Sequence, residues 1–215
     1  MNKSLSKLQN AINIITSSAM EYEKNLNNRN FIFIFKNRTT NQIEYFESVF
    51  LNRNFQHLTG LIFLDKSGNP LSNSTYFYKK CLNKTITTSE ICFKNDGTTE
   101  LKLQALPLIV KFFKSSKMTA IYNSIKPKLA IERLVGTTTF CLGFKKDTHY
   151  YVPSSCLLED IRDLSDVTFQ ILAILSKPAN KNCPTYKDVC YIAKGIELSH
   201  LSLTPELLNL IVIET

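Results

Sequence analysis

The sequence predicts an α+β fold in which an N-terminal helix and several short helices pack on a twisted antiparallel sheet. Three observations predict it: a helical apolar repeat at the start of the chain, aromatic and β-branched runs typical of strands, and polar turns between these runs. With 215 residues and 44% hydrophobic content, the chain is long enough for one sizeable core. We therefore expect a single domain over residues 1–215, with residues 179–215 as a C-terminal helical extension.

The first helix is predicted from apolar residues spaced alternately three and four positions apart, which places them on one helical face. Those residues are Leu5, Leu8, Ile12, Ile15, Ala19, Tyr22 and Leu26. Ser4 can cap the start of the helix, and Asn27 with Asn28 is suited to end it. We expect the apolar face to pack on the sheet.

The strands are predicted from short runs rich in aromatic and β-branched residues. A hairpin is expected from residues 31–38 and 43–50, because a polar turn joins them. An antiparallel meander is expected from residues 130–136, 138–146 and 148–153. Residues 167–178 carry apolar side chains on both faces, which predicts a central strand.

Short helices are expected between and after the strands. In residues 98–113 the apolar side chains fit both a strand and a helix; we favour the helix, with Pro107 as a kink or a second start. Pro153 is expected to end the last strand of the meander. The other expected helices cover residues 75–84, 154–164, 186–198 and 205–213.

The charge of the chain favours a polyanionic partner. The formal net charge is +8, and a basic surface concentrates polyanions, of which nucleic acid is the commonest. The alternative is a basic, solvated surface that binds no ligand. No segment has the roughly 18 consecutive apolar residues of a membrane span, and the N-terminus lacks a signal-peptide pattern. We therefore expect a cytoplasmic protein with no membrane partner.

Several classes of chemistry lack their sequence signatures. The six cysteines form no CxxC pair, so we expect them to be reduced and mostly buried. The motifs of phosphate-loop ATPases, dinucleotide oxidoreductases, α/β-hydrolases and zincins are missing. The three histidines have no acidic partner at ligand spacing, so we expect neither a metal nor another cofactor.

His57 is the strongest candidate for proton transfer, because imidazole titrates near neutral pH. It opens the tetrapeptide HLTG, whose Thr59 would share the His57 face in an extended chain and whose Gly60 permits close backbone approach. The alternative is a polar side chain that hydrogen-bonds beside a turn. For His149 and His200 we favour structural or solvated roles.

A second group of residues has the chemistry to bind nucleic acid. Aromatic rings stack on bases, and lysines hold phosphates. Tyr76, Tyr78, Lys79 and Lys80 gather on one expected helix. An amphipathic helix with solvated lysines is an equally good interpretation. Further hydroxyl and amine donors lie near the meander and at the end of the central strand: Thr137, Thr138, Ser154, Ser155 and Lys177.

Two segments carry a family resemblance. FLNRNFQHLTGLIF, followed by STYFYKKCLNK, resembles the phage-associated Barnase–EndoU–colicin–RelE-like nuclease domains, specifically their fourth described group. The later stretches ERLVGTTTFCLGFKKDTHYYVPSSCLLEDIR and ILAILSKP are also similar to that group. The resemblance covers roughly residues 5–192.

The resemblance implies metal-independent RNA cleavage of the kind found in phage proteins, mobile elements and toxins. In such chemistry the ribose 2′-OH attacks the adjacent phosphate, leaving a 2′,3′-cyclic phosphate and a 5′-OH end. RNA, tRNA included, would be the substrate, and a cognate antitoxin or immunity protein would be a partner. The implied catalytic set is His57 as acid or base, Thr59 to orient the phosphate, and Lys80, Ser155 and Lys177 as phosphate ligands. The implied substrate-binding set is Arg53, Tyr78, Lys79, Thr138 and Ser154.

Two other functions stay open at this point. A non-catalytic RNA- or protein-binding module on the same fold is the main alternative, because only one histidine has a suggestive context and no strong acid–base pair is visible. A phage protein that inhibits or ADP-modifies a host factor is more remote. Loss of RNA cleavage on replacement of His57 would distinguish the ribonuclease from both.

Overall fold

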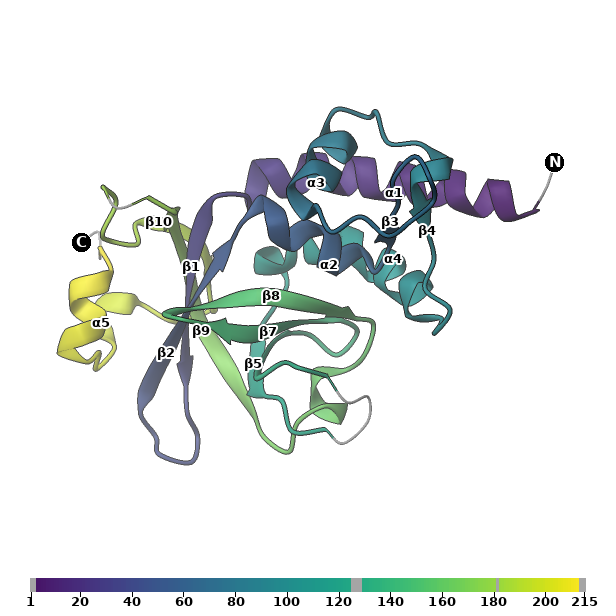
Figure 1. The fold of residues 1–215 in the computed structure, drawn as a ribbon. Coiled ribbons are helices and arrows are strands. Elements are labelled where there is room, and N and C mark those ends of the chain that lie inside the picture. The colour runs from purple at the N-terminus through teal and green to yellow at the C-terminus, as the bar shows by residue number, and fades with distance from the viewer. Residues whose placement is uncertain (1–2, 125–128, 181, 213–215) are drawn as a thin grey trace.

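The fold is a seven-stranded barrel with most of the helices gathered on one side of it (Figure 1). The computed structural model describes residues 3–124, 129–180 and 182–212. In order around the barrel the strands are β1 (Arg29–Lys36), β2 (Ile43–Phe50), β8 (Tyr150–Leu157), β7 (Cys141–Asp147), β6 (Arg133–Gly136), β5 (Met118–Ile121) and β9 (Thr168–Pro178). Pairing of β9 with β1 closes the barrel.

Three further strands lie outside the closed barrel. β10 (Asp188–Ile192) pairs with the C-terminal half of β9. β3 (Ile62–Phe63) and β4 (Ile91–Cys92) form a separate two-stranded sheet. The barrel is mixed, because β2 pairs with β8 in parallel, Ser48 opposite Tyr151.

The expectation of an open, twisted antiparallel sheet is therefore wrong. The expected β1–β2 hairpin is confirmed, as is the meander, to which the structure adds β5. The sequence pattern did not predict that the sheet closes into a barrel. The eleven residues of β9 are enough to pair with β1 along one side and with both β5 and β10 along the other.

Two expected helices are strands instead. Residues 186–198 contain β10, and residues 154–157 continue β8 through Pro153, which was expected to end it. A bulge between Gly143 and Phe144 shifts the β7–β8 register at this point. Because β2 meets β8 at Tyr151, Pro153 lies beyond that pairing, where a missing N–H is tolerated.

The helices are α1 (Lys3–Asn25), α2 (Phe55–Thr59), α3 (Ser74–Leu82), α4 (Thr98–Ile109) and α5 (Pro205–Leu210). Single 3₁₀ turns cover Asn52–Asn54, Thr88–Glu90, Phe112–Lys114, Ile161–Asp163 and Leu198–His200. The helical interpretation of residues 98–109 is confirmed, as are α3 and the start of the last helix, whose N-cap is Thr204. Within the described ranges, no helix is both long and apolar enough to cross a membrane.

The apolar face of α1 is buried as expected, apart from the exposed Leu5 and the half-buried Leu8 near its start. It packs largely on other helices rather than on the sheet alone. The Tyr22 ring lies 5.3 Å from Phe55, 5.7 Å from Tyr78 and 6.4 Å from Phe50. Its hydroxyl donates to the carbonyl of Leu51 at 2.9 Å, which ties α1 to the end of β2.

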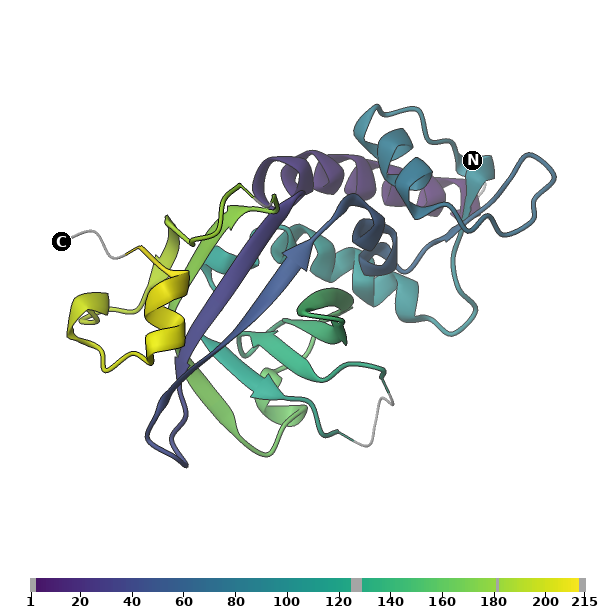
Figure 2. The ribbon, with the colours of Figure 1, turned by 60° about the vertical axis from the view of Figure 1, so that its left-hand side comes forward.

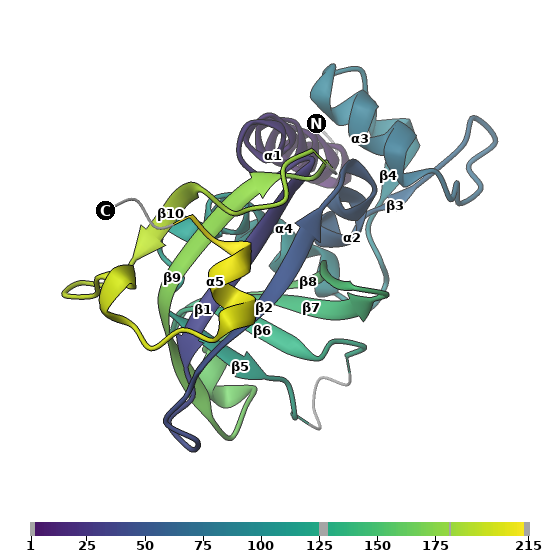
Figure 3. The same cartoon turned by 90° about the vertical axis from the view of Figure 1, so that its left-hand side faces the viewer.

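Aromatic side chains fill the inside of the barrel. Phe31, Phe33 and Phe35 alternate along β1 and all point inward, and the Phe33 ring stacks on Phe46 at 4.6 Å. The intervening Ile32 and Ile34 face outward into a second cluster that α5 covers (Figure 3). β1 is therefore buried on both faces, which explains why its sequence alternates poorly.

Replacing Phe33 by alanine tests this packing. The side chain is fully buried, so we expect the free energy of unfolding to fall by about 3–5 kcal/mol in urea denaturation. Leu101→Ala on α4, where the side chain is 53% exposed, is the control and should change it by less than about 0.5 kcal/mol. Equal, small losses in both variants would show that the interior relaxes around the gap.

Candidate functional site

His57 stands between two adjoining pockets. The larger has a volume of about 550 Å³ and lies between α2, the β3 region and α4. The smaller, of about 210 Å³, lies between α2 and the β7–β8 hairpin. Both are lined by His57, Ser74 and Ser154, so the two pockets meet at the imidazole. We refer to them together as the His57 site.

Local packing fixes the short helix that carries His57. The chain leaves β2 and enters α2 after a single turn, beside the helical layer (Figure 2). Phe55 and Leu58 are fully buried and anchor one face of α2, while His57 is exposed on the other. The HLTG motif is thus a helix end, and its expected extended form is wrong.

Hydrogen bonds at the end of α2 account for the rest of the motif. The Thr59 hydroxyl donates to the carbonyl of Gln56 at 2.8 Å and accepts from the amide of Leu61 at 3.1 Å. Gly60 follows with a φ of +70°, which suits glycine, and a Cβ there would lie 2.9 Å from the Lys102 side chain. Its carbonyl accepts from the Thr99 hydroxyl at 2.8 Å, which locks α4 against α2.

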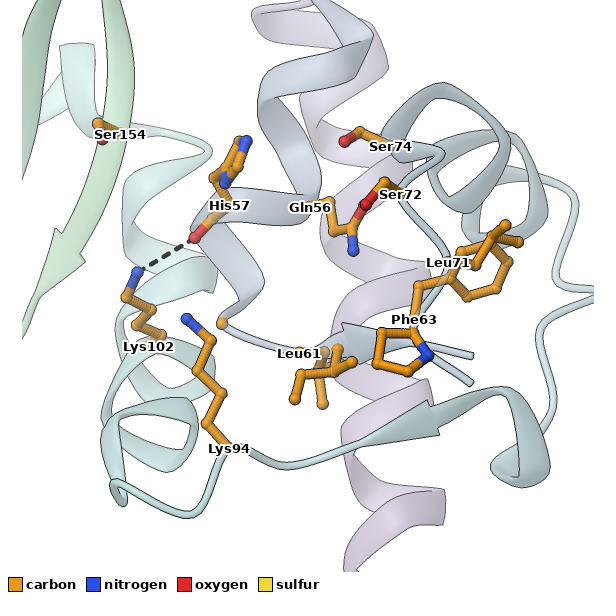
Figure 4. A pocket seen from close by; sticks show the side chains of 13 residues that line it. Gln56, His57, Leu61, Phe63, Leu71, Ser72, Ser74, Lys94, Lys102 and Ser154 are labelled. Carbon is orange, nitrogen blue, oxygen red and sulfur yellow. Dashed lines mark hydrogen bonds between the residues drawn. The ribbon is translucent and has the colours of Figure 1, made fainter. Parts of the chain in front are cut away.

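Four cationic side chains line the His57 site. Lys94 and Lys102 belong to the larger pocket, and Arg53 and Lys145 to the smaller. Lys102 donates to the carbonyl of His57 at 3.2 Å, and Figure 4 shows Lys94 and Lys102 both pointing toward the His57 end of the pocket. Among the described residues, Asp147 is the only carboxylate that lines either pocket, and it lies 3.7 Å from Arg53.

This setting keeps His57 unprotonated. Partial burial lowers the pKa of the imidazole, and the positive charges of Lys145, Lys102 and Lys94 lower it further. Burial also lowers the pKa of Lys102, and the neighbouring Lys94 adds to that effect. At neutral pH His57 can therefore accept a proton, and Lys102 releases one more readily than an ordinary lysine.

Three of the residues expected from the sequence meet at this site: His57, Arg53 and Ser154. Ser155, the next residue on β8, is buried and lines neither pocket. Thr138 is exposed in the turn between β6 and β7. Lys177 lies in a different pocket, which Asn30 and Tyr150 also line.

The other expected residues are held in the helical layer. Thr59 is buried in the turn that ends α2. Tyr78 is buried and donates to Glu23 at 2.6 Å, whereas Lys79 is exposed on α3. Lys80 forms an ion pair with Glu90.

Sequence reasoning missed Ser74, Lys94, Lys102 and Lys145. They come from α3, the loop before α4, α4 itself and β7. The neighbouring sequence does not identify them as site residues, because each is a polar residue in an ordinary amphipathic helix or turn. In the described part of the chain, no group of three or more His, Cys, Asp or Glu residues is placed to hold a metal ion.

The neutral His57, the four cations and the two serine hydroxyls together form an arrangement that suits a polyanion and acid–base chemistry. The chain belongs to the phage-Barnase-EndoU-ColicinE5/D-RelE like nuclease4 family, whose model matches residues 14–195. The resemblance seen in the sequence is confirmed, and the family name indicates a nuclease domain in a phage-like context. No curated protein and no solved structure matches the chain.

Lys145→Met tests the electrostatic origin of the neutral imidazole. Lys145 is the first of the three lysines that depress the pKa of His57. We expect its removal to raise that pKa by a few tenths of a pH unit, followed by NMR titration of the imidazole ring protons. Lys146→Met, the next residue on β7, is the matched control and should leave the titration unchanged. A pKa that does not move in Lys145→Met would contradict the contribution of Lys145 and leave burial, Lys102 and Lys94 as the causes.

Proposed function

We propose that this protein is a metal-independent endoribonuclease of a phage or mobile element, of the toxin or effector type. The observation that carries the proposal is the neutral imidazole of His57 placed between two cation-lined pockets. RNA supplies both groups that this arrangement suits: a phosphate for the cations and a 2′-OH for the base.

The proposed reaction needs one base and one acid. His57 removes the proton from the ribose 2′-OH, and the oxygen forms a bond to the adjacent phosphorus. The bond from phosphorus to the 5′-oxygen breaks, and the Lys102 ammonium gives that oxygen a proton. The products are a 2′,3′-cyclic phosphate and a 5′-OH end. Exchange with water returns His57 to the neutral form and Lys102 to the charged form.

The cations, Lys102 included, would also hold the phosphate and stabilise the negative charge that grows on it. Lys94 and Lys102 reach the larger pocket from one side, and Ser74 lies across it in Figure 4. Arg53 and Lys145 serve the smaller pocket, where a neighbouring phosphate would lie. Fixed positive charge around a phosphorane substitutes for the divalent ion that other nucleases use, which supports metal independence.

The proposed partners follow from the same charge. RNA, with tRNA as one candidate, is the substrate. A cognate antitoxin or immunity protein that blocks the site would present an acidic surface to Arg53, Lys94, Lys102 and Lys145.

Cleavage of total cellular RNA in EDTA tests the proposal. We expect discrete fragments with cyclic phosphate ends from the wild-type protein, and a rate lower by about 10²–10⁴-fold for His57→Ala, the usual contribution of a general base. His149→Ala is the matched control, because this exposed histidine lies at the β7–β8 turn outside both pockets.

The other outcomes are equally decisive. Undiminished cleavage by folded His57→Ala would remove this histidine from the mechanism. RNA that is bound but left intact by the wild-type protein, with and without added Mg²⁺, would favour the non-catalytic binding module on the same fold.

The pH dependence of single-turnover cleavage tests the role of Lys102. The wild-type rate should rise as His57 deprotonates, below pH 6.5, and fall at alkaline pH as Lys102 loses its proton, below 10.5. Lys102→Met should lower the rate at saturating RNA and abolish the alkaline fall.

Lys94→Met is the comparison, since Lys94 is proposed to bind phosphate without transferring a proton. It should raise the KM and keep both limbs of the profile. An alkaline limb that persists in Lys102→Met would assign the acid to another group.

A further inference from the structure

The larger pocket of the His57 site has a charged end and an apolar end. His57, Lys94 and Lys102 form the charged end, where the phosphate lies in the proposed reaction. In the view of Figure 4, Phe63 and Leu71 lie at the opposite end from Lys102. The proposed reaction uses the charged end alone, so the apolar end still needs an explanation.

Three residues of the apolar end present apolar surface to solvent. Ile62 and Leu71 are half-buried and Pro70 is exposed, whereas Leu61 and Phe63, which also line the pocket, are almost fully buried. Apolar surface inside a pocket, next to a few polar side chains, is typical of sites that bind an apolar or aromatic group.

Hydrogen bonds hold this apolar wall in place. The backbone amide of Leu71 donates to the carbonyl of Phe63 at 2.7 Å, which closes the turn between them. Within that turn the Asp65 carboxylate accepts from the amides of Ser67 and Asn69 at 2.8 and 2.9 Å. The wall is therefore already formed without a ligand, which lowers the entropy that binding would cost.

Two polar side chains lie between the charged and apolar ends. Figure 4 shows Gln56 and Ser72 between Lys102 and Leu71. Within the described ranges neither the Gln56 carboxamide nor the Ser72 hydroxyl takes part in a hydrogen bond, so both are available to the polar edge of a ligand.

The smaller pocket of the His57 site suits a different group. Its volume of about 210 Å³ is below the roughly 300–1,000 Å³ usual for small-molecule sites, whereas the larger pocket, at about 550 Å³, lies within that range. Arg53, Lys145 and Asp147 also place three charges along the smaller pocket. Charge and size therefore favour a phosphate in the smaller pocket and an aromatic ring in the larger.

The covalent structure of RNA decides which aromatic ring that would be. A single ribose carries the 2′-OH that His57 deprotonates, the phosphate that is attacked and, on the carbon next to the 2′-OH, a nucleobase. When the 2′-OH lies at His57 and the phosphate at Lys94 and Lys102, the base is only one sugar ring away. Of the two pockets that meet at His57, the larger has the apolar wall that a flat ring needs.

We propose that the apolar end of the larger pocket binds the nucleobase of the nucleotide that supplies the 2′-OH, the one on the 5′ side of the cleaved bond. The base packs on Ile62, Pro70 and Leu71, and its polar edge meets Gln56 and Ser72. The assignment rests on the proposed function, because the 2′-OH at His57 sets which nucleotide enters.

The experiment is an NMR titration of the full chain with adenosine 3′-monophosphate. Ribose 5-phosphate is the comparison, because it has the sugar and a phosphate ester of the same charge but no base. We expect both ligands to shift the resonances of His57, and only the nucleotide to shift the methyl groups of Ile62 and Leu71. The nucleotide should bind at least about fivefold more tightly, the lower end of the usual gain from stacking one base.

Variants of the apolar wall complete the test. Leu71→Asn keeps the size of the side chain and removes its apolar surface, and Ile62→Thr is a milder change of the same kind. Each should weaken nucleotide binding at least about threefold and leave the affinity for ribose 5-phosphate unchanged. Leu108→Asn, at an exposed leucine of α4 outside the larger pocket, is the matched control and should bind both ligands as the wild type does. Thermal unfolding shows which variants are folded.

Failure of this inference is distinct from failure of the ribonuclease proposal. Equal affinity for the nucleotide and ribose 5-phosphate, or nucleotide binding that is unchanged in the folded wall variants, would overturn the base pocket even if RNA is cleaved. Nucleotide binding that needs Leu71, in a protein that leaves RNA intact, would support the base pocket and overturn the cleavage proposal.

Discussion

The pairing of β1 with β9 is the constraint on which the rest of the structure depends. Every residue of β1 has a partner on both β2 and β9, so the strand cannot shift without breaking two ladders. Closure fixes β2 against β8 where Ser48 pairs with Tyr151, and α2 follows the end of β2 after a single turn. The strands of the barrel therefore place α2, which carries His57, beside Ser154 of β8.

The like charges gathered at the His57 site oppose folding and also affect the protonation of its side chains. Gathering Arg53, Lys94, Lys102 and Lys145 around one depression brings like charges together, and Asp147 is the one carboxylate among the described residues that line it. Repulsion of this kind opposes folding. Burial favours the unprotonated forms of His57 and Lys102, and the same repulsion adds to that effect. A bound phosphate would relieve it, which makes substrate binding and the stability of this face interdependent.

Features set by neighbouring residues could be predicted from the sequence, and those set by distant pairing could not. The α1 helix, the β1–β2 hairpin and the long strand β9 follow from local spacing and composition. Closure joins strands separated by more than a hundred residues, and no local pattern records it. Residues 186–198 have an apolar spacing that fits a helix, but the free edge of β9 takes part of them as β10.

The residues of the His57 site also divide into those that could be predicted from the sequence and those that could not. His57 and Arg53 lie close together in one segment, so motif and charge were enough to find them. Lys102 is carried on α4, and the hydrogen bonds from Thr99 to Gly60 and from Lys102 to His57 hold that helix beside α2. Thr59 was expected at the site because an extended chain would place it beside His57; the helix turns it into the protein instead, where it holds the turn.

Side chains fill the interior of the barrel, and this limits where the protein can bind a ligand. Seven strands enclose a space that Phe31, Phe33, Phe46 and Phe144 already occupy, so the barrel is a packed core with no room for a ligand. Polar function is left to the outer face and to the elements that extend from it. Asn30 shows this within one strand, because its neighbour Phe31 points into the core while Asn30 lines a pocket on the outside of the barrel. The His57 site agrees with this arrangement, because it lies between α2, α4 and the β7–β8 hairpin, outside the filled interior.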